Sequence, residues 1–175
     1  MKIAVGQGSC GIAAGAGKAY DVLNSSLDLN NNQLTVTGCI GMCYLEPIVD
    51  VYADDGLHRF VKVNGEIAEK IALAINNNDL SSVKEFEISD DDKQFLDKQT
   101  RIALRHCGVI NPEIIEDYTN DDGYKALNKV LTTMSPEDVI EEIKVSGLAG
   151  RGGAGFPTWF KWNAARQSIG DKKYL

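Results

Sequence analysis

A glycine-rich run that also carries aromatic and basic side chains is the most constraining feature of this sequence. Residues 147–162 read GLAGRGGAGFPTWFKW and hold five glycines in sixteen positions. Glycine lets the backbone adopt positive φ and approach a ligand closely, so that successive N–H groups can bind an anion. Arg151 and Lys161 add positive charge to the same run. The run therefore predicts a site for a phosphate-bearing cofactor.

The context of the run excludes the two commonest phosphate loops. Its Gly-x-Gly-x-x-Gly spacing over residues 150–155 matches a dinucleotide fingerprint, but a Rossmann loop must leave a strand. Here Ser135, Pro136 and the acidic residues after them predict a preceding helix. A P-loop is excluded because no Gly-Lys-Ser/Thr sequence closes the run. We expect a second helix to begin near Thr158 or Trp159, with an N-terminus that favours phosphate.

A flexible linker is the alternative interpretation of this run. Linkers are rich in glycine and serine and are fully hydrated. This run instead carries large aromatic side chains, which need burial, at Phe156, Trp159, Phe160 and Trp162. We therefore expect a packed loop.

The segment from Ser135 to Trp162 resembles the FMN-binding segment of the NADH-binding flavoprotein subunit of respiratory complex I. The same module occurs in related NAD-linked hydrogenases and electron-bifurcating enzymes. The sequence GRGGAGFPT, followed by Lys-Trp, carries the resemblance, although the family usually has Gly-Leu where this chain has Trp159 and Phe160. The resemblance implies that FMN is bound by Gly150, Arg151, Gly152, Gly153, Ala154, Gly155 and Lys161.

Charge is distributed unevenly along the chain. The formal net charge of −7 argues against a nucleic-acid partner. Residues 143–175 nevertheless hold six of the 18 lysines and arginines and only one of the 25 acidic residues. This basic stretch coincides with the predicted phosphate site, and a solvated basic face is the alternative. The short apolar start of the chain predicts neither a signal peptide nor membrane insertion, so a cytoplasmic location is expected.

Alternating strands and helices predict a small thioredoxin-like α/β domain over residues 1–80. We expect a β-α-β-β-β-α order, with strands at 1–5, 33–37, 48–53 and 58–63 and helices at 13–24 and 67–75. Residues 81–134 predict a helical connector, with helices from about 90 to 105 and from 124 to 131. Residues 135–175 then form the start of an FMN/NADH-binding α/β domain, truncated in a new strand that begins at Lys172.

Three cysteines of the first domain, Cys10, Cys39 and Cys43, are predicted to lie in loops. Cysteines of a cytoplasmic chain are thiols or metal ligands rather than disulfides. Cys39 and Cys43 flank three residues of a glycine-rich loop and can face one iron, with backbone N–H groups donating to the sulfurs. A disulfide oxidoreductase would have two intervening residues, which disfavours thiol exchange.

This layout resembles the thioredoxin-like [2Fe–2S] domain of a partner subunit of complex I, which hydrogenase relatives carry fused ahead of the flavoprotein module. The resemblance implies a [2Fe–2S] cluster on Cys10, Cys39 and Cys43. The family uses four cysteines, and the first is missing here, where Ala4 and Val5 stand. A bound cluster and a degenerate domain kept for packing or docking both remain open.

The remaining cysteine and the two histidines give no metal-binding pattern. Cys107 is expected to be a buried small apolar residue. His58 and His106 have no partner at metal-ligand spacing, so they are expected at the surface or at caps.

Together, the two resemblances imply the N-terminal portion of an NADH dehydrogenase flavoprotein subunit. In such an enzyme NADH reduces FMN, and electrons pass to iron–sulfur clusters. The remaining flavin and NAD contacts and the cysteines of a [4Fe–4S] cluster would lie beyond Leu175, so this chain alone is expected to be inactive. The implied partners are other subunits of an NADH dehydrogenase or hydrogenase complex. A non-catalytic electron-transfer or docking subunit and a nucleotide-binding regulatory module are the alternatives.

Overall fold

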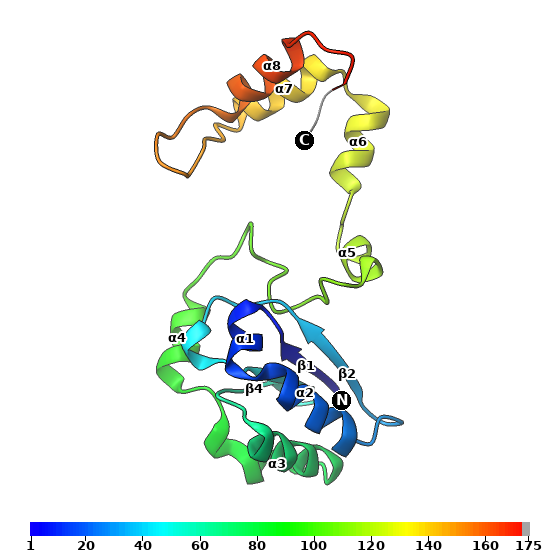
Figure 1. The fold of residues 1–175 in the computed structure, drawn as a ribbon, viewed down its shortest axis with the longest axis vertical. Helices are drawn as coiled ribbons and strands as arrows, with labels where there is room; N and C mark the ends of the chain where they lie inside the picture. The colour runs from blue at the N-terminus through cyan, green and yellow to red at the C-terminus, as the bar shows by residue number, and fades with distance from the viewer. Residues whose placement is uncertain (173–175) are drawn as a thin grey trace. The chain divides into compact units, whose positions relative to one another are not determined.

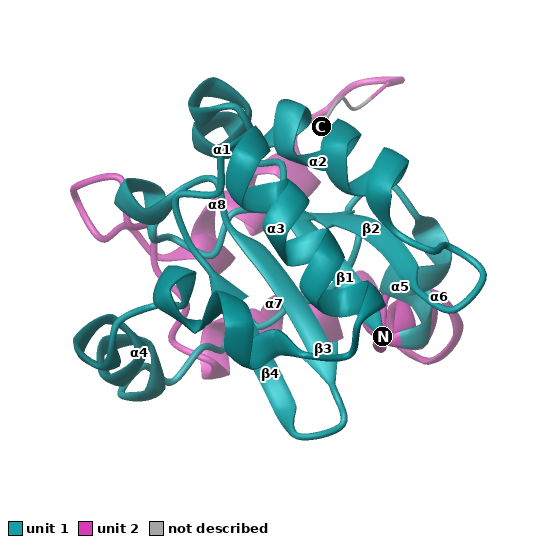
Figure 2. Cartoon of the chain, turned by 90° about the horizontal axis from the view of Figure 1, so that it is seen from below, with its two compact units in different colours: residues 1–120 teal, residues 121–175 magenta. Residues whose placement is uncertain are grey.

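The chain folds as two units. A computed structural model describes residues 1–172, and it separates a first unit of residues 1–120 from a second of residues 121–175 (Figures 1 and 2). The boundary lies within the predicted helical connector. The strand predicted from Lys172 onward falls on residues outside the described range.

A four-stranded sheet forms the frame of the first unit, in the order β2-β1-β3-β4 (Figure 2). Its strands are β1 (Lys2–Gly6), β2 (Gln33–Thr37), β3 (Val49–Ala53) and β4 (Gly56–Phe60). β1 is parallel to β2 and antiparallel to β3, and β3 is antiparallel to β4. A β-α-β half joined to a β-β-α half in this order is the thioredoxin-like topology, which confirms the predicted fold.

Three helices accompany the sheet in the first 80 residues. α1 (Ser9–Ala14) and α2 (Ala16–Ser26) connect β1 to β2, and α3 (Gly65–Asn76) follows β4. The single helix predicted over 13–24 is wrong, because Gly15 adopts φ +102° and ends α1 with its amide hydrogen-bonded to preceding carbonyls. α3 begins at Asn64, whose side chain accepts the N–H of Ile67.

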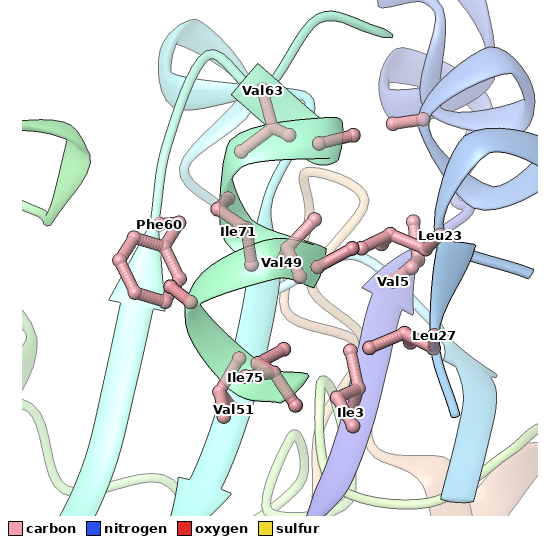
Figure 3. Packing of buried hydrophobic residues seen from close by; sticks show 14 of the residues in the cluster. Ile3, Val5, Leu23, Leu27, Val49, Val51, Phe60, Val63, Ile71 and Ile75 are labelled. Carbon is pink, nitrogen blue, oxygen red and sulfur yellow. The ribbon is translucent and has the colours of Figure 1, made fainter. Parts of the chain in front are cut away.

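The main core lies between the sheet and the helices α2 and α3 (Figure 3). Alternate residues of a strand point to the same face, so each strand sends a small set of side chains into this layer. The fully or almost fully buried members include Ile3, Val5, Leu23, Val49, Val51, Phe60, Ile71 and Ile75. Each side chain of this size contributes about 1.5–3 kcal/mol when fully buried, so this layer dominates the stability of the unit.

The opposite face of the sheet carries a buried ion pair. Asp50 lies between Val49 and Val51 in β3 and is therefore directed to the other face. Arg59, its register partner in β4, donates to both carboxylate oxygens at 2.7 Å. A second apolar cluster, made of Ile40, Met42, Leu45 and Ile48, belongs to the loop between β2 and β3 and the residues that lead into β3.

The segment after α3 packs back on this loop. It contains a 3₁₀ helix (Leu80–Phe86), then α4 (Asp90–Asp97) and α5 (Ile115–Asn120). The helix predicted to reach about residue 105 ends at Asp97. Beyond it, the Arg101 guanidinium donates to the Ile40 carbonyl at 2.7 Å, and the Asn111 amide donates to the Thr35 hydroxyl at 3.3 Å. These long-range contacts override the local helical preference.

The second unit consists of helices α6 (Lys125–Thr133), α7 (Pro136–Val145) and α8 (Thr158–Gln167). α7 begins where the sequence predicts, with a capping box between Ser135 and Asp138 and proline at its first position. α7 and α8 lie side by side (Figure 1). Within residues 1–172, no helix is both long enough and apolar enough to cross a membrane.

Candidate functional site

The glycine-rich loop joins α7 to α8 and is closed at its base by backbone hydrogen bonds. The amide of Gly150 donates to the Phe156 carbonyl at 2.9 Å, and the amide of Thr158 donates to the Leu148 carbonyl at 3.0 Å. These two bonds hold residues 151–155 as a projecting loop. α8 begins at Thr158, as predicted, directly after the second bond.

The loop is open where a ligand would approach. Gly153 has φ +150° and Gly155 has φ +61°, and a Cβ atom built on either residue meets nothing within 4 Å. Gly152 is equally open. Within residues 1–172, the amides of residues 151–156 donate no hydrogen bond. The loop therefore offers unused N–H donors on a backbone that glycine alone adopts easily.

Lys161 is brought back to the base of this loop. Its Nζ atom lies 3.7 Å from the position of a Cβ atom built on Gly150, although eleven positions separate the two residues. α8 produces this approach, because Lys161 lies one turn inside the helix and can reach toward its N-terminus. Arg151 lies exposed on the loop, where no contact with the described residues fixes its guanidinium. The structure thus joins Lys161 to the loop and leaves Arg151 unanchored.

The four aromatic residues around the loop are not buried as predicted. Phe156, Phe160 and Trp162 remain 47%, 51% and 49% exposed. The rings of Phe156 and Phe160 meet edge to face with centroids 5.5 Å apart. Trp159 is partly covered, with the Lys144 ammonium 5.7 Å from its ring centroid. A helix pair has no second layer that could cover every aromatic face.

These features fit the phosphate end of FMN. A phosphate needs several hydrogen-bond donors and positive charge, and the loop supplies free amides, the N-terminus of α8 and the Lys161 ammonium. No described side chain fills the space in front of Gly152 or Gly153. The assignment of Gly150, Arg151, Gly152, Gly153, Ala154, Gly155 and Lys161 to FMN stays a prediction.

A pair of thiols in the first unit has the geometry of ligands to one metal ion. The Sγ atoms of Cys39 and Cys43 lie 3.9 Å apart, and the amide of Gly41 points at the Cys39 sulfur from 3.2 Å. Two thiolates on a tetrahedral ion with metal–sulfur bonds of about 2.3 Å lie roughly 3.8 Å apart. Gly41, at φ +90°, allows the tight turn that points its N–H inward. The pair therefore fits one iron of a cluster.

Cys10 lies in α1 rather than in the predicted loop, and it is exposed. α1 nevertheless packs tightly against the loop of Cys39. A Cβ atom built on Gly8 would lie 2.8 Å from the Cβ atom of Cys39, so only glycine fits there. Within residues 1–172, no three histidine, cysteine or acidic side chains surround one ion position. The cluster ligands Cys10, Cys39 and Cys43 stay a prediction.

Cys107 lies behind the same loop. The neighbouring Gly108 adopts φ +78°, and a Cβ atom built on it would come within 2.1 Å of the Ile40 side chain. Cys107 itself is half-buried, which differs from the full burial expected of it.

Glu46 is a residue of this region that the sequence interpretation missed. The residue is 7% exposed, and its carboxylate accepts the amide of Ile48 at 3.0 Å. Burial raises the pKa of Glu46. Burial also raises the pKa of Cys39. The hydrogen bond from the Gly41 amide lowers this pKa, whereas the neighbouring Cys43 and Glu46 raise it further. An acidic residue between Leu45 and Pro47, in an otherwise apolar stretch, is the sequence signal that could have identified it.

His58 is the other missed residue. Its two ring nitrogens lie 2.6 Å from Glu87 and 3.0 Å from Asp55. The hydrogen bonds to Glu87 and then Asp55 raise the pKa of His58. This trio carries no metal-site geometry and acts as a local ionic clamp.

Known proteins match this chain over part of its length. No family profile matches it. The NADP-reducing hydrogenase subunit HndC of Solidesulfovibrio fructosivorans is 55% identical over 78 residues, which are 45% of this chain and 16% of the relative. The F 2 subunit of the NADH-quinone oxidoreductase of Rhizobium meliloti is 40% identical over 74 residues, 42% of this chain and 18% of the relative. The resemblance to flavoprotein subunits of NADH dehydrogenases and NAD-linked hydrogenases is therefore confirmed.

These matches favour an oxidoreductase subunit over a docking subunit or a regulatory module. The chain spans less than a fifth of the length of the two relatives. A thioredoxin-like [2Fe–2S] ferredoxin from Aquifex aeolicus, a cysteine-to-serine variant, is 21% identical in sequence with a TM-score of 0.43. The alignment covers 51% of this chain and 98% of that one. At that score the likeness adds nothing to the topology described above.

Proposed function

We propose that this chain is the N-terminal portion of an NADH-oxidising flavoprotein subunit and that its glycine-rich loop holds FMN. The observation that carries the proposal is the open loop of residues 151–155, with unused amides and Lys161 at its base. The similarity to subunits named for NADH-quinone oxidoreductase and NADP-reducing hydrogenase supports the same cofactor chemistry.

Each part of the loop has a distinct task in this proposal. The amides of residues 151–155 donate to the phosphate of FMN, and Lys161 supplies a mobile positive charge beside Gly150. Glycines at 153 and 155 keep the backbone in conformations that a side chain would oppose. When bound, FMN supplies hydride acceptance from NADH and release of electrons one at a time. The protein holds the cofactor by its phosphate end and orients it.

The first unit supplies the electron-transfer partner in the same proposal. Cys39 and Cys43 hold one iron of a [2Fe–2S] cluster, and Cys10 holds the other. NADH and a [4Fe–4S] cluster are bound by further parts of the enzyme, which works with other subunits of an NADH dehydrogenase or hydrogenase complex in the cytoplasm. Because residues 1–175 correspond to a small part of the relatives, we expect them to show no steady NADH turnover with added FMN.

The test compares two glycine variants of the polypeptide in which this chain naturally occurs. Gly153→Val places a β-branched side chain at φ +150° and in the space of the ligand. It should abolish both FMN retention and NADH-dependent reduction of an artificial acceptor. Gly17→Val, on an exposed site of α2 with nothing within 4 Å of its Cβ position, is the matched control. Full FMN content and activity in Gly153→Val would refute the assignment of the loop.

A further inference from the structure

The loop between β2 and β3 brings two of the four thiols of this chain together. The Sγ atoms of Cys39 and Cys43 lie 3.9 Å apart, and both residues are free thiols. Cys10 lies exposed in α1, and within residues 1–172 no third histidine, cysteine or acidic side chain joins the pair around an ion position. Two neighbouring thiols are too few for a complete metal site, but they are all that a disulfide bond requires.

The loop that carries the two thiols is anchored to the rest of the first unit. Ile40 and Met42 are buried in the second apolar cluster, and the Ile40 carbonyl accepts the Arg101 guanidinium at 2.7 Å. These alternate positions leave Cys39 half-buried and Cys43 exposed. Because the loop is already ordered, joining the two sulfurs costs little further chain entropy.

The backbone turn at Gly41 directs the two thiols toward each other. Gly41 adopts φ +90°, and its amide points at the Cys39 sulfur from 3.2 Å. A disulfide has a sulfur–sulfur distance of about 2.05 Å, so the two sulfurs must approach by about 1.9 Å. This is less than a sulfur moves between two staggered rotamers, and the exposed Cys43 side chain has room to rotate.

We propose that Cys39 and Cys43 form a reversible disulfide when the first unit carries no iron. This inference goes beyond the proposed function, because it needs neither a cluster nor FMN. Disulfides of cytoplasmic proteins are usually transient or redox-sensing. Three residues separate the two cysteines, whereas disulfide oxidoreductases have two, so the pair acts as a redox switch and not as a thiol-exchange catalyst.

The oxidant is a low-molecular-weight disulfide of the class of oxidised glutathione. The thiolate of Cys43, the more exposed residue, attacks one sulfur of this disulfide, and the first glutathione leaves as a thiolate. The thiolate of Cys39 then attacks the Cys43 sulfur and displaces the second glutathione. Each leaving thiolate takes up the proton that the attacking thiol lost. The two cysteines thus lose two electrons, which reduce one small disulfide to two thiols.

The disulfide withdraws both sulfurs from metal binding. Iron in such clusters is bound by thiolates, and neither sulfur of a disulfide is one. Iron can therefore load onto this loop only after the disulfide is reduced. Small thiols reverse the bond by the same exchange reaction.

The test uses the natural polypeptide, stripped of metal by a chelator, reduced, and then freed of both reagents. It is treated with oxidised glutathione, the remaining thiols are alkylated with N-ethylmaleimide, and tryptic peptides are analysed by mass spectrometry. Cleavage after Lys18 and Arg59 releases a peptide of residues 19–59, which contains Cys39 and Cys43 and no other cysteine.

In the parent, this peptide should carry neither glutathione nor an alkyl group, and it should be lighter than its reduced form by two hydrogen atoms. Dithiothreitol before alkylation should restore two alkylated cysteines. Cys39→Ser should leave at least about tenfold more glutathione on Cys43 than the parent has, because the neighbouring thiol displaces it in the parent. Cys107→Ser is the matched control and should form the same disulfide as the parent.

Exposed Cys10 serves as the internal standard for the oxidant, because an isolated thiol should stop at the mixed disulfide with glutathione. Glutathione or alkyl groups on both Cys39 and Cys43 of the parent, at a concentration that modifies Cys10, would overturn the inference. A bond from Cys10 or Cys107 to either member of the pair would also overturn it. Because the experiment contains no iron, its result is independent of the proposed cluster, which iron and sulfide contents test separately.

Discussion

The two units of this chain use their apolar side chains in opposite ways. Phe60 in the sheet of the first unit is fully buried, whereas Phe160 beside the glycine-rich loop is 51% exposed. The first unit has a sheet with helices on its face and hence a closed core. The second is a set of short helices defined by a capping box, loop hydrogen bonds and an ion pair between α7 and α8. The first unit is therefore stabilised by packing, and the second displays a loop.

Matched phenylalanine variants test this contrast most strongly. Phe60→Ala should lower the free energy of unfolding of the first unit by about 3–5 kcal/mol, because it leaves a cavity in the core. Phe160→Ala removes a half-exposed ring and should cost no more than about 0.5 kcal/mol. Urea denaturation followed by circular dichroism measures both values. Equal losses would contradict the assignment of the core to the first unit.

Matched ion-pair variants sharpen the comparison. Arg59→Met leaves the buried carboxylate of Asp50 without its partner and should cost roughly 3 kcal/mol. Arg166→Met breaks the exposed pair with Glu137, whose atoms lie 2.6 Å apart, and should cost at most about 1 kcal/mol. The same denaturation experiment reports both. A larger loss for Arg166→Met would show that the second unit depends on its ion pair.

Charge at the loop gives a smaller and more specific effect. Lys161→Ala should weaken FMN binding by about 1.5–3 kcal/mol, roughly 10- to 150-fold in Kd, the scale of one charge-assisted hydrogen bond. Lys129→Ala, on the exposed surface of α6, should leave Kd unchanged. Fluorescence titration of FMN into the natural polypeptide measures the difference. Equal effects of the two variants on Kd would show that Lys161 acts only through long-range electrostatic attraction and makes no direct contact with FMN.

The histidine clamp predicts the smallest effect, a pH dependence of the first unit. Glu87 and Asp55 raise the folded-state pKa of His58. Protonated His58 therefore stabilises the folded state fully below the unfolded pKa of about 6.5, and this stabilisation is lost as pH rises through the higher folded-state pKa. His58→Gln should remove this part of the pH dependence. The melting temperatures of the parent and the variant are measured across this pH range. Melting temperatures that change with pH in parallel would contradict the account.

The sequence predicts the elements that rest on local signals. The cap at Ser135 and Pro136, the strand at 33–37 and the fold order of the first unit are all found where expected. Gly15 is also a local signal. Its αL conformation separates α1 from α2, whereas apolar periodicity alone predicts one continuous helix. The α8 start at Thr158 follows from the proline before it.

Long-range contacts are what the sequence does not predict. Beyond the end of α4, for example, Arg101 bonds to the carbonyl of Ile40, sixty-one positions away. The burial of Glu46 depends on two distant glycines, Gly6 and Gly11, and no periodicity reveals such a pocket. The predicted burial of the aromatic residues fails because burial needs a second layer, which α7 and α8 do not form by themselves. The cysteines were identifiable from the sequence, but the buried Glu46 was not.

The most direct test of the central claim is to measure iron, sulfide and FMN together in the natural polypeptide and in two variants. If the first unit holds the cluster and the loop holds the flavin, Cys39→Ser should lose iron and sulfide of the [2Fe–2S] cluster and keep FMN. Gly153→Val should lose FMN and keep the iron and sulfide. Loss of both cofactors in either variant, or retention of both in either one, would contradict the account.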